Sequence, residues 1–102
     1  MNNLSMIKQA MELRQKLNKA QKELGKITVE GQAGNGAVVA KANGQQKITA
    51  ISISAEVINP QKARELEKLV LKAVEEALNK SQELAARQMK EITGGMNIPG
   101  LT

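Results

Sequence analysis

The sequence contains no cysteine, no histidine and no aromatic residue. Without cysteine there are no disulfide bonds and no thiolate chemistry, which suits a protein of the reducing cytoplasm. Without histidine, cysteine or tyrosine, the commonest acid–base groups, nucleophiles and soft-metal ligands are also missing. We therefore expect no enzyme activity, no catalytic residues, no metal site and no cofactor.

Long apolar runs are missing too. No stretch approaches the roughly 20 residues of a membrane span, and no short apolar block follows an N-terminal charge as in a signal peptide. We expect a soluble, cytoplasmic protein that does not enter a membrane. The chain has 102 residues, which fits a single domain over 1–102. Its core has to come from Leu, Ile, Val, Met and Ala, which bury less area per residue than aromatic side chains do.

The charge is positive and unevenly distributed. The net charge is +5 and the pI is about 9.7. Residues 1–26 carry six bases and two acids, residues 27–59 balance at zero, and residues 60–102 carry seven bases and six acids. The N-terminal segment is therefore the basic part of the chain.

Heptad-like spacing predicts an amphipathic helix over residues 3–25. The apolar seam consists of Met6, Ala10, Leu13, Leu17, Ala20 and Leu24. Gly25 follows the last seam residue and is a suitable helix stop.

Alternation with a period of two predicts three antiparallel strands over residues 26–32, 37–43 and 46–54. The dipeptides Asn35-Gly36 and Asn43-Gly44 separate these runs, and Asn-Gly is a strong hairpin signal. A meander this small needs a helix or another sheet to cover it.

A second helix is predicted over residues 60–92. Asn59 offers an N-cap, Pro60 suits the first turn, and Gly94-Gly95 ends the helix. A short turn around residues 56–58 is expected before it. The fold class is thus α+β: a helix, a three-stranded antiparallel meander and a long C-terminal helix.

The lengths of these elements do not match. A seven-residue strand spans about 23 Å, whereas helices of 20 and 33 residues span about 30 and 50 Å. The helices should therefore overhang the sheet with apolar seams along most of their length. We expect a homodimer, because a second copy would cover these seams and the open strand edges.

One face of the first helix is a candidate surface for nucleic acid. At 100° per residue, lysines fall opposite the apolar seam, with Arg14 on a flank. The predicted DNA-binding residues on this helix are Lys8, Arg14, Lys16, Lys19 and Lys22. Such a row can follow phosphates without reading bases, and the lack of aromatic side chains disfavours single strands. The alternative is that these lysines only keep the helix soluble.

A second, weaker basic stripe lies on the long helix. It comprises Lys80, Arg87 and Lys90, and the acidic Glu83 lowers its positive charge.

Two other motifs give little support for a functional site. Adjacent residues on a helix do not face each other, so Glu75-Glu76 is interpreted as solvated surface. The run from Gly34 to Gly36 lacks the third glycine of a dinucleotide loop, so a hairpin turn explains it better.

Three segments together resemble the YbaB/EbfC family of bacterial nucleoid-associated proteins. They are "MIKQAMELRQKLNKAQKEL", "VEGQAGNGAVVAKANG" and "TGGMNIPGLT", and the resemblance covers essentially the whole chain. It implies a tweezer-like homodimer with protruding helical arms. It also implies binding to double-stranded DNA with little sequence preference, a place on the nucleoid and an influence on gene expression.

Two hypotheses stay open beside these. The first concerns the C-terminal strip, where Met96, Ile98 and Leu101 either dock on an exposed apolar groove of the same or the partner subunit or belong to a mobile chain end. The second is a different function, in which the arms form a scaffold that holds a helical protein of the replication or recombination machinery.

Overall fold

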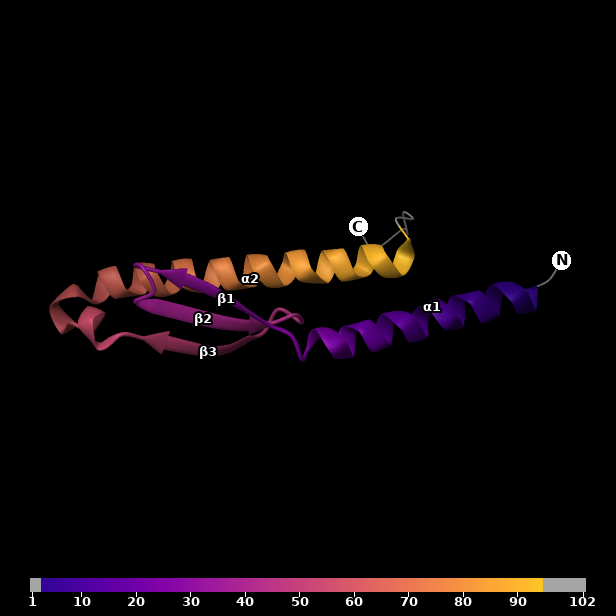
Figure 1. The fold of residues 1–102 in the computed structure, drawn as a ribbon, viewed down its shortest axis with the longest axis horizontal. Coiled ribbons are helices and arrows are strands. Elements are labelled where there is room, and N and C mark those ends of the chain that lie inside the picture. Colours follow the sequence, from indigo (N-terminus) through magenta and orange to yellow (C-terminus); the bar gives the residue numbers. More distant parts are fainter. Residues whose placement is uncertain (1–2, 95–102) are drawn as a thin grey trace.

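The computed structural model, which describes residues 3–94, has the predicted α+β element order. Helix α1 is followed by a three-stranded sheet, two short 3₁₀ turns and a long helix α2 (Figure 1). The bounds are α1 Asn3–Leu24, β1 Thr28–Ala33, β2 Val38–Asn43, β3 Ile48–Ile53, η1 Ala55–Val57, η2 Pro60–Lys62 and α2 Ala63–Thr93.

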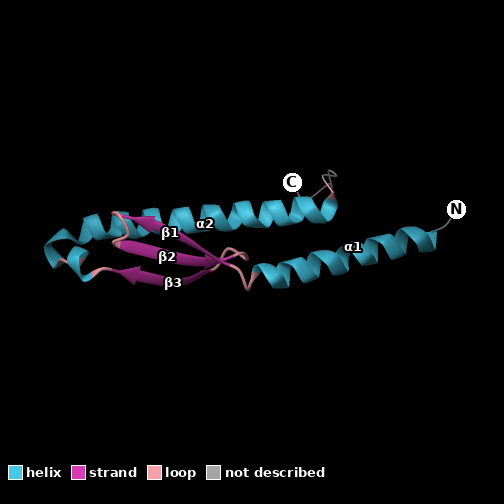
Figure 2. Cartoon of the chain, in the orientation of Figure 1, coloured by secondary structure: helices cyan, strands magenta, loops and turns pink. Residues whose placement is uncertain are grey.

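The sheet is an antiparallel meander with strand order β1-β2-β3 (Figure 2). In β2 the buried residues Val38, Ala40 and Ala42 alternate with more exposed ones. This alternation places one face of β2 under α2 and the other toward solvent. Both β1 and β3 are edge strands.

Helix α2 packs unusually close to β1. A Cβ atom added at Gly31 would lie 2.2 Å from the carbonyl oxygen of Ala73 and 2.4 Å from the amide nitrogen of Ala77. Only hydrogen at position 31, opposite alanines on the helix, allows the two backbones to approach this far. The core is accordingly built from small side chains: Ala33, Val38, Ala40, Ala42, Ala73 and Ala77 are buried together.

A buried hydroxyl joins α2 to the second hairpin. The Ser81 Oγ donates to the carbonyl oxygen of Asn43 at 2.7 Å and accepts from the amide of Gln46 at 3.0 Å. Because Ser81 is fully buried and both of its partners are backbone groups, this contact fixes where the hairpin lies along the helix.

The two hairpin turns differ from each other. Gly34, Asn35 and Gly36 all have positive φ, which suits the predicted Asn-Gly turn. In the β2–β3 turn the residue with positive φ is Gln46, not Gly44. Asn43 instead closes this turn with its side chain, whose Oδ1 accepts from the amides of Gln45 at 2.9 Å and Lys47 at 3.2 Å.

Both ends of α2 follow from local chemistry. The Asn59 side chain accepts from the amide of Gln61 and so caps η2, and α2 begins only at Ala63 rather than at residue 60. Gly94 ends α2 in the left-handed region, with φ 61°. The hypothesis about the C-terminal strip concerns residues that lie outside the described range.

The described chain is long and narrow, with extents of 71 × 21 × 17 Å. Helices α1 and α2 run antiparallel and both project past the same end of the sheet (Figure 1). The N-terminal half of α1 continues beyond the end of α2. The overhang predicted from the element lengths is therefore present.

The close approach at Gly31 predicts a large loss of stability for Gly31→Ala. The new methyl group would collide with helix backbone, so α2 has to shift, and we expect a loss of about 3 kcal/mol. Gly94→Ala is the control, because nothing lies within 4 Å of its added Cβ; the left-handed backbone alone costs about 1 kcal/mol. Denaturant unfolding at one fixed protein concentration measures both variants, and equal losses would contradict the close-packing explanation.

Candidate nucleic-acid interface

Helix α1 is buried only at its C-terminal base. Ala20 and Leu24 are buried, Leu13 and Leu17 are half-buried, and Met6 is 68% exposed. The apolar seam therefore faces α2 near the sheet and loses its cover toward the N-terminus. Helix α1 is an arm held at one end.

The β2–β3 turn holds the base of this arm. The amide of Gly44 donates to the carbonyl oxygens of Leu24 at 2.8 Å and Ile27 at 3.1 Å. The Gln45 Nε2 donates to the carbonyl oxygen of Gln21 at 2.8 Å. The carbonyl oxygens of Gln21 and Leu24 lie in the last turn of α1 and also accept from the amides of Gly25 and Ile27, so the β2–β3 turn adds second hydrogen bonds at this end of the helix. A Cβ added at Gly44 would lie 2.6 Å from the Leu24 oxygen, so glycine is required here for close contact.

Three lysines of α1 lie on the side of the helix away from its seam, and Arg14 and Lys16 lie on its two flanks. At 100° per residue, Lys8, Lys19 and Lys22 fall roughly opposite the buried Ala20 and Leu24. All five predicted residues of this helix are exposed. The ion pairs among the described residues are Lys41–Glu30 and Lys80–Glu76, so neither uses a base of α1. This face, defined by Lys8, Lys16, Lys19 and Lys22, is called the α1 basic face below.

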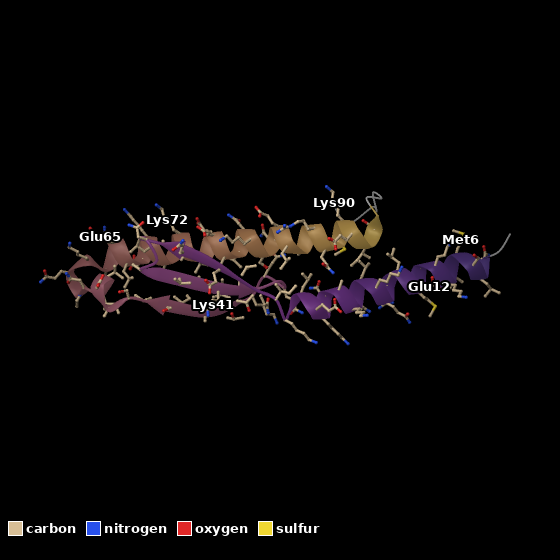
Figure 3. All side chains as sticks on the ribbon, viewed as in Figure 1. Met6, Glu12, Lys41, Glu65, Lys72 and Lys90 are labelled. Carbon is tan, nitrogen blue, oxygen red and sulfur yellow. The ribbon has the colours of Figure 1, made fainter. Side chains whose placement is uncertain are left out.

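The predicted residues of α2 do not join the α1 basic face. The Lys80 Nζ donates to the carbonyl oxygen of Glu30 at 2.8 Å and lies 3.2 Å from a carboxylate oxygen of Glu76. Lys80 thus ties α2 to β1. Lys90 projects from α2 away from α1 (Figure 3), and Arg87 is exposed on the same half of the helix. The eight predicted residues therefore form two separate surfaces.

The sequence interpretation missed the role of the β2–β3 turn in holding α1. Asn43-Gly44 signalled a hairpin, but nothing local indicated that Gly44 would contact Leu24, twenty residues earlier. A turn glycine that does not have positive φ indicates that another backbone segment passes close to it. The φ angle and the neighbouring segment are known only from the structure.

An apolar surface remains uncovered beside α2. Val38 pairs with Ile53 and Ala40 with Ile51, so these isoleucines share the face of the sheet on which α2 lies. Helix α2 covers mainly β1 and β2, and every residue of β3 is exposed. An open groove of about 650 Å³ follows along the start of α2 and is lined by side chains including Ile58, Leu66, Val70, Leu71 and Val74. Ile51, Ile53 and this groove are called the β3 apolar face.

Other kinds of site find little support within residues 3–94. No three His, Cys, Asp or Glu residues gather there as they would around a metal ion. None of the helices in this range combines the length and apolarity needed to cross a membrane. Of the Glu75-Glu76 pair, Glu76 is bound to Lys80 and Glu75 is exposed.

Comparison with known proteins agrees with this architecture. Residues 1–96 match the model of the YbaB/EbfC DNA-binding family. A nucleoid-associated protein of Caldanaerobacter subterraneus subsp. tengcongensis is 46% identical over 97 residues, covering 95% of this chain and 87% of the relative. One from Pelotomaculum thermopropionicum is 41% identical over 100 residues, covering 98% and 95%.

The fold itself has been seen before. The crystal structure of an uncharacterized protein from Helicobacter pylori matches with a TM-score of 0.66 at 14% identity, covering 94% of this chain and 97% of that one. The α+β fold of this chain is thus known from a solved structure. This chain belongs to the YbaB/EbfC DNA-binding family. That family is defined by DNA binding and is not a known class of enzymes.

The junction at Gly44 predicts that Gly44→Ala loosens α1 specifically. The added methyl group would push the turn from Leu24, so amide exchange at residues 20–24 should rise at least tenfold while residues 73–77 keep their protection. Hydrogen exchange followed by mass spectrometry measures both segments. Gly36→Ala is the control, because it strains the other hairpin and meets only a Gln32 side chain at 3.4 Å. If both variants exposed α1 alike, the β2–β3 turn would not be what holds the arm.

Proposed function

We propose that this protein binds double-stranded DNA with little sequence preference through the α1 basic face, organises the nucleoid and thereby influences gene expression. The observation that carries the proposal is a row of exposed lysines, unpaired within the described chain, on an arm that projects from the body. Membership of a DNA-binding family and the nucleoid-associated relatives support it.

The arm has suitable dimensions for duplex DNA. From Lys8 to Lys22 the α1 basic face spans about 21 Å, which is about six base pairs of B-DNA at 3.4 Å each. Lysine side chains are flexible point charges, so they neutralise phosphates without requiring a particular base sequence. Binding of this kind gains free energy mainly from counterion release and weakens steeply as salt rises.

The second basic surface contributes less in this proposal. Lys80 already uses its ammonium group on Glu30 and Glu76. Arg87 and Lys90 are exposed, but Glu83 and Glu91 are exposed on the same half of α2. Because Lys90 projects away from α1, we assign Arg87 and Lys90 to weak DNA contacts that are separate from the α1 basic face.

The functional unit in this proposal is a homodimer joined through the β3 apolar face. Ile51 is 45% exposed, Ile53 38% and Ile58 57%, and Ile58 also lines the apolar groove along the start of α2, so much apolar surface is open to water. The free edge of β3 also carries unpaired backbone groups. A second copy covers both, and its own α1 supplies a second arm, so one particle grips DNA twice and gains avidity.

A charge reversal tests the DNA surface. The variant Lys8→Glu/Lys16→Glu/Lys19→Glu/Lys22→Glu should lose at least tenfold in affinity for unrelated duplexes. The slope of log K against log salt should fall by about one for each lost contact. Fluorescence anisotropy across a salt series measures both quantities.

The matched control reverses four lysines elsewhere, Lys47, Lys62, Lys68 and Lys72, all of them exposed. It changes net charge by the same amount, so it should weaken binding much less if contact with α1 matters. Equal losses in both variants would show that overall charge, and not α1, drives binding. Absence of salt-sensitive DNA binding by the native protein would favour the scaffold hypothesis, in which the arms hold a replication or recombination protein.

The dimer has its own test. Ile51→Glu places a charge on the β3 apolar face and should convert the dimer to monomer in sedimentation at micromolar concentration. Ala50→Glu is the matched control, because position 50 is exposed on the same strand but points to the other face of the sheet. A native protein that sediments as a stable monomer, or an Ile51→Glu variant that stays dimeric, would contradict this interface.

A further inference from the structure

The seam of α1 loses its partner where α2 ends. In Figure 1 the end of α2 lies level with the middle of α1, so the N-terminal half of the arm extends alone. Leu13 is half-buried there, whereas Ala10 is exposed and Met6 is 68% exposed. Met6 projects toward the side of α1 on which α2 lies (Figure 3). Met6, Ala10 and Leu13 are called the open seam.

Helix α2 ends beside the point on α1 where the open seam begins. Gly94 ends the helix in the left-handed region, and eight residues follow it. In that segment Met96, Ile98 and Leu101 are apolar, and Pro99 restricts the backbone.

The lengths agree with this placement. On α1 the open seam spans about 10 Å from Leu13 to Met6, and eight extended residues reach about 26 Å. Because α2 runs antiparallel to α1, a chain that continues in the direction of α2 proceeds along the arm toward Met6 (Figure 1).

We propose that residues 95–102 dock on the open seam of α1 in the same chain, so that their apolar side chains continue the cover that α2 provides nearer the sheet. The tether favours this occupant over a second molecule, because a short linker keeps the segment at a millimolar effective concentration beside the seam. The docked segment ties the free half of α1 to the end of α2 and stiffens the arm. This inference does not depend on DNA binding.

Cysteine pairs test the contact directly, because the native chain has no cysteine to interfere. In the full-length protein, Met6→Cys/Ile98→Cys should form an intramolecular disulfide at least tenfold faster than Met11→Cys/Ile98→Cys. Met11 is a matched control: it is 59% exposed on the same half of α1, but helical spacing places it away from the open seam. Non-reducing gels and intact mass separate the bond within one chain from a bond between chains.

Hydrogen exchange supplies an independent readout without cysteine. Ile98→Asp/Leu101→Asp should raise amide exchange at residues 6–13 several-fold and leave residues 20–24 unchanged, because only the far half of the arm loses its cover. Equal disulfide rates for the two cysteine pairs, a product mainly between chains, or unchanged exchange at residues 6–13 would each overturn the proposal.

Discussion

The close contact between α2 and β1 is the constraint on which the rest of the structure depends. Gly31 has no side chain and Ala73 and Ala77 have small ones, so two backbones meet where larger side chains would hold them apart. A helix this close to the sheet covers mainly two of its three strands. The third strand is therefore left with exposed isoleucines, and the core stays small for a chain of this length. The same contact that makes the body compact also leaves the apolar face of β3 exposed.

The position of the arm follows from that body. Ser81 anchors the β2–β3 hairpin on α2, and the turn of that hairpin in turn binds the C-terminal carbonyls of α1 through Gly44 and Gln45. Three elements distant in sequence thus set the direction of one helix through a few hydrogen bonds to backbone groups. Because α1 is held only at its base, its lysines remain in solvent, and their charges are available to a polyanion.

The sequence indicated much of this fold, because the signals it depended on are local. Periods of 3.5 and 2 distinguished helices from strands, and Asn59-Pro60 and Gly94 marked the start and end of the last helix region within three residues. The α1 basic face was also visible, because helical spacing alone separates Lys8 and Lys19 from the seam. What could not be predicted depends on distant neighbours: the roles of Gly31 and Gly44, the hydrogen bonds of Ser81, and the contact of Lys80 with Glu30, fifty residues away. The pattern of β3 likewise indicated a buried face but not which surface would bury it.

In the proposed complex, DNA lies along the outer side of α1. Titrating isotope-labelled protein with an unrelated duplex and following backbone amide shifts by NMR tests this at every residue at once. The largest changes should fall at Lys8, Lys16, Lys19 and Lys22 and their neighbours, weaken together as salt is added, and spare the sheet. Changes concentrated on the sheet or on α2, with α1 unperturbed, would contradict it.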